Sequence, residues 1–456
     1  MDKKHEEEAR SLLPPGSLSR REFLRLAGAA GATVGLGAGL GGFIAGCGGE
    51  EAATTTAPGD TTAGGATGRA IKIGFVTPLT GPIAGFGEAD TFCIEEWKAA
   101  APTVQIGGTI HPITLVVSDS QSDPNRAAQV AGDLINNDKI DLMLVASTPD
   151  TVNPVADQCE ANGVPCISND TPWQPFFFGR GGDPAVGFKW TYHFFWGLED
   201  VIVNFTDMWK SVGANSAGAM WPNDPDGNAW ADDQTGFPRA LAEQGFTLVD
   251  PGRYQQLTED FSAQIARFKQ ANCDILTGVM IPPDFANFWK QAAQQGFKPK
   301  IASVGKGLLF PSSMEALGDI GYGLTTEVWW TPAHPFTSSL TGESCAAIAA
   351  KYEEKTGKQW TQPLLHYAVY EVAINALQRT ADIDDKEAIV EAIKTTKMDT
   401  LAGPVDWSTG PVPNVSKTPL VGGQWVKGEK YPYDLVVVNN SIAPMVPLGG
   451  EVQPLS

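Results

Sequence analysis

The chain has 456 residues, which is too long for one average domain and comfortable for two. Its 52 acidic residues outnumber its 32 basic residues and give a formal net charge of −20. This balance argues against nucleic-acid binding, which needs a basic footprint.

The N-terminal stretch has the pattern of an export signal. Arg20, Arg21 and Arg25 form a charged start, and residues 26–46 carry no charge, as a bacterial secretory signal requires. Because each glycine of this run costs a helix roughly 1 kcal/mol relative to alanine, we favour a cleaved signal over a permanent membrane helix. The sequence SRREFL at residues 19–24 resembles the twin-arginine (Tat) signal, which implies export of a folded protein.

The signal ends in IAGC at residues 44–47, which resembles the lipobox of bacterial lipoproteins. The resemblance implies that residues 1–46 are removed and that Cys47 receives a lipid. Residues 48–68 have the Gly, Thr and Ala bias of a flexible tether. We therefore expect a signal peptide over 1–46, a lipidated flexible linker over 47–69, and an extracytoplasmic protein that its lipid anchors to the cell membrane.

Predicted strands and helices alternate through the next part of the chain. Apolar strands that alternate with amphipathic helices indicate a parallel sheet covered by helices on both faces. The first set has strands at 71–81, 112–121, 140–147 and 164–170 and helices at 89–100, 125–138 and 151–163.

A second set of the same kind predicts a second lobe. Its strands fall at 216–224, 246–254, 273–280 and 300–305, its helices at 228–245, 260–272 and 284–296, and two further helices follow at 364–380 and 386–396. Ligands of such sheets bind outside the carboxyl ends of the strands. The loops that we expect to carry function are therefore 78–87, 118–124, 146–151, 168–173, 221–230 and 280–284.

Several tryptophans lie at the predicted loop ends. For any one of them, packing in the core is favoured, but together they could line a cleft that grips an apolar or planar ligand. They are Trp173, Trp190, Trp196, Trp221, Trp230, Trp329 and Trp330.

Five cysteines follow Cys47, so at least one stays unpaired if the others form disulfides. Cys159 and Cys166 lie close together in CEANGVPC. A short-loop disulfide between them and a role as small buried hydrophobic residues are both open. The five are Cys93, Cys159, Cys166, Cys273 and Cys345.

The sequence shows no motif of an enzyme. It contains no GxSxG, HExxH or GxxxxGK[ST] pattern in the mature region, and its histidines are spread along the chain without recognisable partners. The acidic clusters lack the spacing of a calcium loop, and turn formation explains them better. We expect neither an enzyme nor a cofactor or metal.

An ordered set of motifs resembles the extracytoplasmic solute-binding proteins of ABC importers, of the branched-chain amino-acid-binding (leucine-binding) type. The resemblance implies an α/β fold of two Rossmann-like lobes with parallel sheets, joined by three crossovers and closing on a ligand by hinge motion. Lobe 1 would comprise 70–190 plus 305–415, and lobe 2 would comprise 191–304 plus 416–456. The motifs are IKIGFVTPLTGPIAGFG, SDSQSDPNRAAQVAGDLINND, GVPCIS, EDFSAQIARFKQANCDIL, PDFANFWKQAAQQGFKP, YEEKTG and AGPVDW.

The resemblance also implies site residues. Phe86 would cover the ligand, Ser147 and Thr148 would hold an amino acid's α-carboxylate, and Asp284 would pair with its α-ammonium. A helix N-cap is an equally good reading of Asp284. Trp329 would lie near the wall that contacts the ligand's side chain. The second polar wall would be the loop of Ser168, Asn169, Asp170 and Thr171.

Two departures from the family pattern affect the carboxylate pocket. Pro149 has no N–H to donate, and Asp170 would repel an anion. A cationic, amide or aromatic ligand therefore stays open beside an amino acid.

These observations predict a monomeric lipoprotein that binds an amino acid or a related small polar or aromatic solute. Its partners would be that ligand, an ABC permease with its ATPase, and the membrane through the lipid anchor. A ligand-sensing receptor of the same fold, coupled to a signalling partner, is the alternative.

Overall fold

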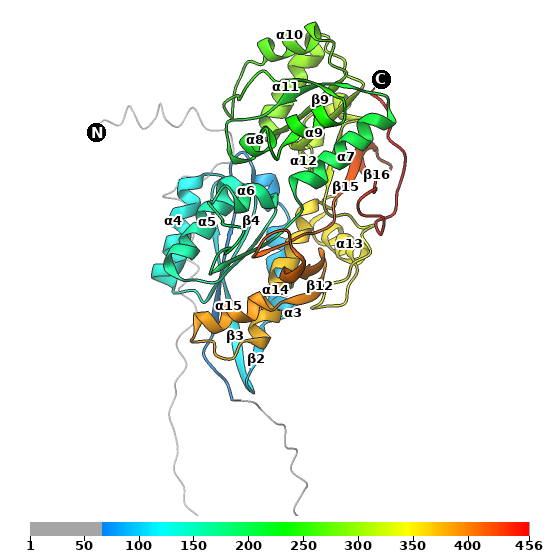
Figure 1. The fold of residues 1–456 in the computed structure, drawn as a ribbon. Coiled ribbons are helices and arrows are strands. Elements are labelled where there is room, and N and C mark those ends of the chain that lie inside the picture. Colours follow the sequence, from blue (N-terminus) through cyan, green and yellow to red (C-terminus); the bar gives the residue numbers. More distant parts are fainter. Residues whose placement is uncertain (1–65, 456) are drawn as a thin grey trace, which may run out of the picture. The chain divides into compact units, whose positions relative to one another are not determined.

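Two seven-stranded sheets organise the protein in the computed structural model, which describes residues 66–455 (Figure 1). The predicted signal peptide, Cys47 and nearly all of the predicted linker lie outside the described residues. Among residues 66–455, no helix is long and apolar enough to cross a membrane.

The first sheet has the order β14-β6-β5-β4-β1-β3-β2. All its pairings are parallel except that of β2 with β3. The strands are β1 (Ile71–Thr77), β2 (Thr103–Ile106), β3 (Thr109–Asp119), β4 (Leu142–Ala146), β5 (Cys166–Asn169), β6 (Thr191–Phe194) and β14 (Val415–Ser416).

The side chains of β4 show why this sheet is covered on both faces. Met143 and Val145 belong to the hydrophobic cluster that packs under α4 (Pro124–Asp133) and α5 (Pro149–Asn162). Leu142 and Leu144 belong to the cluster on the other face, with α3 (Asp90–Ala100) and α14 (Tyr367–Arg379). A strand buried on both faces reads as a continuous apolar run. Also in this lobe are α6 (Trp173–Phe177), α13 (Cys345–Thr356), α15 (Lys386–Lys394), β12 (Lys397–Thr400) and β13 (Gly403–Asp406).

The second sheet has the order β16-β15-β11-β10-β9-β7-β8 and is parallel except at β15 and β16. Its strands are β7 (Ser216–Met220), β8 (Thr247–Val249), β9 (Ile275–Met280), β10 (Ile301–Lys306), β11 (Thr325–Val328), β15 (Val421–Lys427) and β16 (Tyr433–Asn439). Its helices are α7 (Leu198–Ser211), α8 (Pro225–Trp230), α9 (Phe237–Glu243), α10 (Ser262–Gln270), α11 (Pro282–Gln294) and α12 (Pro311–Glu315).

The two sheets confirm the predicted fold class of two Rossmann-like lobes. The chain passes between the sheets after β6, after β11 and after β14. Two crossovers therefore fall later in the chain than expected, because β6 hydrogen-bonds to β5 in the first sheet and β11 pairs with β10 in the second. By sheet membership, the strand at 191–194 belongs to lobe 1 and the strands up to 328 belong to lobe 2.

One predicted helix is wrong in extent. The segment 228–245 forms α8 and α9 with a turn between them, not one helix. The Asp232 carboxylate accepts the N–H groups of Gln234 and Thr235, at 2.9 and 2.8 Å, and so closes a turn in place of a helical bond.

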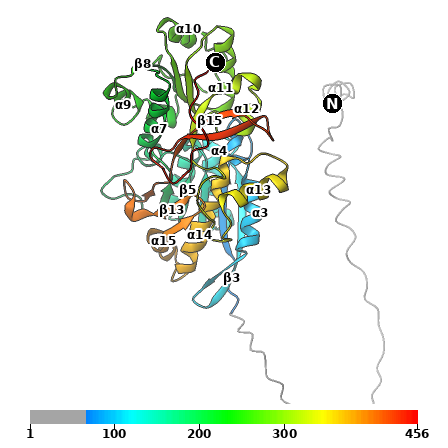
Figure 2. The same ribbon diagram turned by 90° about the vertical axis from the view of Figure 1, so that its right-hand side faces the viewer.

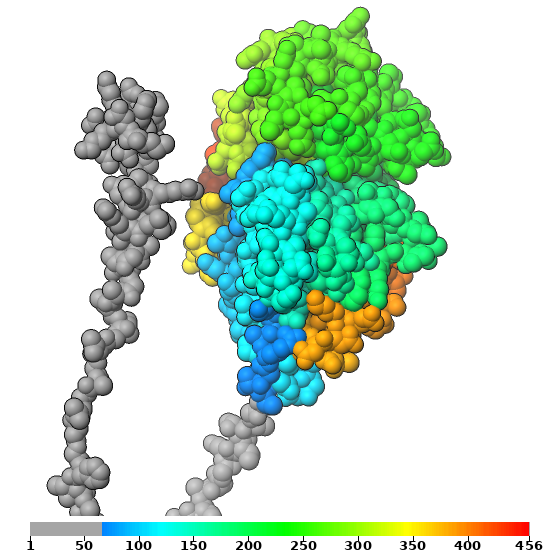
Figure 3. Space-filling view, turned by 90° about the vertical axis from the view of Figure 1, so that its left-hand side faces the viewer, coloured from blue at the N-terminus to red at the C-terminus, as the bar shows by residue number. Residues whose placement is uncertain are grey.

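Segments that lie far apart in the sequence meet at the base of lobe 1. The orange residues around α15 lie beside the start of the described chain in Figure 3, where Arg69 binds Asp384 and the carbonyl of Ile383. In Figure 2 the β2–β3 hairpin extends from this same end, away from the second lobe. The functional end of the lobe is the opposite one, where the strands point toward the second sheet.

The five cysteines of residues 66–455 are buried free thiols. Burial raises the pKa of Cys93 and Cys159 well above the ordinary thiol value. In this structure, Cys159 and Cys166 therefore pack as small hydrophobic residues.

Candidate functional site

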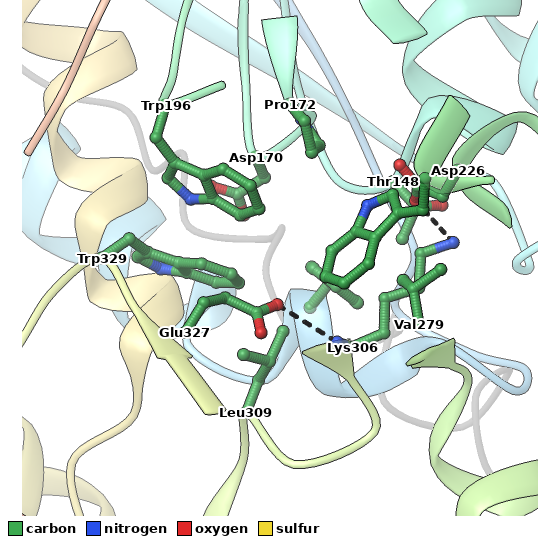
Figure 4. A pocket seen from close by; sticks show the side chains of 12 residues that line it. Thr148, Asp170, Pro172, Trp196, Asp226, Val279, Lys306, Leu309, Glu327 and Trp329 are labelled. Carbon is green, nitrogen blue, oxygen red and sulfur yellow. Dashed lines mark hydrogen bonds and ion pairs between the residues drawn. The ribbon is translucent and has the colours of Figure 1, made fainter. Parts of the chain in front are cut away.

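A small cavity of about 20 Å³ lies between the carboxyl ends of the two sets of strands (Figure 4). Small-molecule sites in doubly wound folds occupy this position. The two lobes meet around it, since α8 of lobe 2 packs against α5 and α6 of lobe 1. The lining residues are Phe86, Thr148, Asp170, Pro172, Trp196, Asp226, Trp230, Val279, Lys306, Leu309, Glu327 and Trp329.

Aromatic rings form much of this lining. Phe86 and Trp329 stack with their ring centroids 6.1 Å apart, and Phe310 meets Phe86 edge-on at 5.0 Å. On the other side, Trp230 stacks on Phe237 at 4.9 Å. Rings that neighbours hold in this way offer fixed apolar faces to a ligand.

The indole N–H groups of the lining tryptophans differ in whether they have a hydrogen-bond partner. Trp329 donates its N–H to the carbonyl of Gln362 at 3.2 Å. The N–H groups of Trp196 and Trp230 are buried and have no partner in the described part of the chain. A buried donor without a partner costs free energy, so these two groups favour a ligand that accepts hydrogen bonds.

A chain of buried polar groups stands behind the lobe 1 wall. His366 lies between two carboxylates: its Nδ1 is 2.6 Å from Asp90 Oδ1, and its Nε2 contacts Asp170 Oδ2. Thr77 donates its hydroxyl to Asp90. Burial alone would lower the pKa of His366, but Asp170 and Asp90 raise it to about 10. We therefore treat His366 as a cation, which holds the Asp170 carboxylate in place.

Only one of the two carboxylate oxygens of Asp170 bonds to His366. Asp170 has a left-handed backbone, with φ of 68°, and Oδ1 is buried without a hydrogen-bond partner in residues 66–455. Because Asp170 lines the cavity (Figure 4), this oxygen is an acceptor available to a ligand.

A cation surrounded by carboxylates forms part of the lobe 2 wall. Lys306 Nζ lies 2.6 Å from Asp226 Oδ2, 3.5 Å from Asp224 and 3.8 Å from Asp150. Burial alone would lower the pKa of Lys306, but the three carboxylates together have the larger effect and raise it well above the ordinary lysine value. Since Asp150 lies on α5 of lobe 1, this cluster joins the two lobes.

Local sequence explains how the lobe 2 acids are placed. Asp224 caps α8 by accepting the N–H of Gly227 at 2.6 Å, and Pro225 occupies the first turn. This start fixes Asp226 in the first turn and Trp230 at the end of the same short helix. Burial raises the pKa of Asp226 to about 7, although Lys306 opposes the shift.

Glu327 adds a third carboxylate to the cavity. It stands on β11 and accepts the backbone N–H of Lys306 at 3.2 Å and the hydroxyl of Thr326 at 3.1 Å. Burial raises its pKa to about 7 against these donors. Figure 4 shows its carboxylate between Trp329 and Lys306.

The structure brings four of the predicted site residues together in the lining: Phe86, Thr148, Asp170 and Trp329. The other hydroxyl residues of these loops are buried close to it. Thr171 donates to the carbonyl of Ser147 at 2.9 Å, and Ser168 bonds to His193 Nδ1 at 2.9 Å. The hydroxyls of Ser147 and Thr148 have no partner among the described residues.

Asp284 is not among the lining residues of this cavity. It lies in the first turn of α11, and its Oδ1 accepts the N–H of Leu257 at 2.9 Å. Burial raises its pKa to about 7. In this arrangement, Asp284 fastens the segment before α10 to α11.

Some residues of the site carried a sequence signal and some did not. Asp226 and Trp230 fall in the loop 221–230, which the sequence marks as a strand end. Lys306 is the last residue of β10, so the expectation that ligands bind at the carboxyl ends of strands also indicates Lys306. Glu327 lies within a buried strand, and His366 acts through residues far away in the chain, so no local pattern indicates either.

The comparisons with known proteins agree with this geometry. A family model described as "Periplasmic binding protein" matches residues 70–421. A Leu/Ile/Val-binding protein homolog 2 of Brucella abortus is 25% identical over 390 residues, which cover 81% of this chain and 95% of that protein.

Two solved structures have the same fold. A leucine binding protein from Thermotoga maritima superposes with a TM-score of 0.68 at 22% identity, over 81% of this chain and 99% of its own. A solute binding protein of an ABC transporter from Rhodopseudomonas palustris, in complex with 3,4-dihydroxybenzoic acid, gives 0.66 at 18% identity, over 82% and 99% of the chains.

Proposed function

The chain belongs to the periplasmic binding protein family, and from that premise we propose that it captures a small solute between its lobes and delivers it to an ABC importer. Hinge closure of two lobes around a ligand is the motion of this class of protein. The observation that carries the proposal is the cavity itself, which residues from both lobes enclose. A solute held there would stabilise the closed arrangement.

The proposed ligand is an amino acid or a related small polar or aromatic solute. One relative of this chain is a Leu/Ile/Val-binding protein homolog, and one protein of the same fold was solved with an aromatic acid bound. The aromatic lining supports a ligand with an apolar or planar part. We propose Phe86, Thr148, Asp170 and Trp329 as contacts, with Ser147, Ser168 and Thr171 shaping the loops behind them.

A binding role fits the buried Ser168–His193 pair better than catalysis does. Burial lowers the pKa of His193 to about 3, and its Nε2 faces the carbonyl of Thr171 at 2.6 Å. Neither side chain belongs to the cavity lining. The pair therefore ties β5 to β6 and offers no nucleophile to a bound solute.

We also propose that the protein is a monomeric lipoprotein on the extracytoplasmic side of the membrane, anchored through Cys47. The support is the sequence before residue 66, with its Tat-like signal and lipobox-like end. The acidic surface implied by the net charge of −20 suits a soluble domain on a tether.

Thermal unfolding with a panel of amino acids, amides, amines and aromatic acids tests the function. A ligand at 100 times its Kd adds about 2.7 kcal/mol to the folded state, so a true ligand raises the Tm clearly. If no member of the panel raises the Tm, the proposal loses its support.

A pair of tryptophan variants locates the binding. We expect Trp196→Leu to weaken binding of the ligand found by about 1 kcal/mol, roughly fivefold, because a fixed aromatic face is lost. Trp190→Leu, at a tryptophan outside the cavity lining, should leave the Kd unchanged. Equal effects of both variants would contradict this site.

A further inference from the structure

The charged side chains of the cavity are mostly acidic. Asp170, Asp226 and Glu327 line it, and Lys306 is the one cation among the lining residues of this described cavity. Lys306 is already paired, with Asp226, Asp224 and Asp150 all within 4 Å of its Nζ. Its charge is therefore used within the protein and is not free to hold an anionic ligand.

The polar atoms without partners show what a ligand must supply. Asp170 and Asp226 are 3% and 2% exposed, and one oxygen of each has no hydrogen-bond partner in residues 66–455. Buried carboxylate oxygens require N–H or O–H donors, and a charged donor satisfies them best. The buried N–H groups of Trp196 and Trp230 require acceptors in turn.

A carboxylate on the ligand would be poorly placed in this cavity. Beside Thr148 stands Pro149, which has no N–H to donate. Across the same wall stands the Asp170 carboxylate, which would repel a second carboxylate. The indole faces, in contrast, attract a cation through their π-systems.

We propose that the ligand is a small organic ammonium ion that carries a neutral hydrogen-bond acceptor, such as a hydroxyl or an amide carbonyl, and no carboxylate. Its ammonium group binds Glu327 and the free oxygens of Asp170 and Asp226, and its neutral acceptor faces the indole N–H groups. This inference rests on the proposed solute-binding function and narrows it, because it excludes zwitterionic amino acids as the preferred ligand.

A matched series of compounds tests the inference by titration calorimetry on the purified protein. Leucinol and phenylalaninol are the ammonium alcohols, leucine and phenylalanine add the carboxylate, and 4-methylpentanoate and 3-phenylpropionate keep the carboxylate but lack the amine. We expect at least one amino alcohol to bind about tenfold or more tightly than its amino acid, the scale of one lost charged hydrogen bond. The anions should not bind.

The outcomes separate the ligand class from the function. Tighter binding of an amino acid or of an anion overturns the ammonium proposal and leaves solute binding intact. No binding by any of the six compounds overturns the ammonium proposal and also counts against the proposed function.

Two isosteric variants check that the carboxylates act as proposed. We expect Glu327→Gln to weaken binding of the preferred amino alcohol about tenfold or more and Asp226→Asn to weaken it in the same direction. Glu354→Gln, at an exposed glutamate, is the matched control and should bind as the wild type does. If Glu327→Gln keeps its Tm and binds the amino alcohol with unchanged Kd, the proposal is wrong.

Discussion

The two walls of the cavity both contain a buried cation between carboxylates, but they are built differently. In lobe 1, His366 is completely buried between Asp90 and Asp170, and all three belong to the same lobe. In lobe 2, Lys306 binds Asp224 and Asp226 and also reaches Asp150 on the opposite lobe. One cluster is complete within its lobe, while the other is complete only when the lobes meet.

This difference separates two roles for buried charge. The lobe 1 cluster holds Asp170 in a fixed position whatever the distance between the lobes. The lobe 2 cluster contributes a contact that would break if the lobes moved apart. Charge in lobe 1 therefore serves folding and the preorganisation of the wall, and charge in lobe 2 would also affect the proposed closing of the lobes.

The largest effect is expected from His366→Ala. It leaves Asp90 and Asp170 buried without their cation, and removing one partner of a buried ion pair costs about 3–5 kcal/mol. Urea unfolding measures the loss in free energy of unfolding. The control is His111→Ala, which removes one hydrogen bond to the carbonyl of Arg69 and should cost about 1 kcal/mol.

The pH dependence sharpens this first prediction. Because the folded-state pKa of His366 is raised to about 10, its stabilisation is fully present below its unfolded pKa of about 6.5 and is lost as pH rises through about 10. The difference between wild type and His366→Ala should be largest near pH 6 and shrink toward pH 10. A difference that stays constant across this range would show that His366 is neutral in the folded protein.

A smaller effect is expected from Lys306→Met. The methionine fills much of the same space, but Asp226 and Asp224 lose their charged hydrogen-bond donor, and a hydrogen bond to a charged group is worth about 1.5–3 kcal/mol. The loss is below that of His366→Ala because methionine keeps most of the lysine's packing, whereas alanine also leaves a cavity where the imidazole was. Lys300→Met, at a half-exposed ion pair with Asp274, should cost about 0–1 kcal/mol in the same unfolding assay.

The smallest effect on stability is expected from Asp150→Asn. Its carboxylate lies 3.8 Å from Lys306 and is partly exposed, so its removal should cost about 0–1 kcal/mol. The variant should nevertheless populate the open form more, which small-angle scattering of the ligand-free protein detects as a larger radius of gyration.

A control on the same helix distinguishes the lobe-joining contact from a general effect of charge. Asp157 also lies on α5 but pairs with Arg180 inside lobe 1, at 2.7 Å. We expect Asp157→Asn to leave the radius of gyration unchanged. If both variants open the protein equally, Asp150 has no special part in closure.

The sequence predicts the fold well because its signal is local. The apolar run of β4 and the helical spacing on either side of it require only neighbouring residues, and the sheet that they predict is present. The error at 228–245 also has a local cause, since the Asp232 turn interrupts the segment.

The site is less predictable because its groups meet across long stretches of chain. His366 and Asp90 are separated by 276 positions, and Lys306 and Asp224 by 82. The strand-end loop indicates Asp170, but no local pattern indicates the cation His366 that supports it. Residue type and loop position therefore predict which residues face the cavity, while the charges behind them require the folded structure.

The crossovers after β6 and β11 also contribute to the cavity wall, through Trp196 and Trp329. A hinge that carries part of the binding surface transmits the bulk of the solute directly to the torsion angles about which the lobes turn. A wide solute would stop the rotation of the lobes at a larger opening angle, and a narrow solute would let the lobes close further. The exterior of the closed protein would then report the size of the solute as well as its presence.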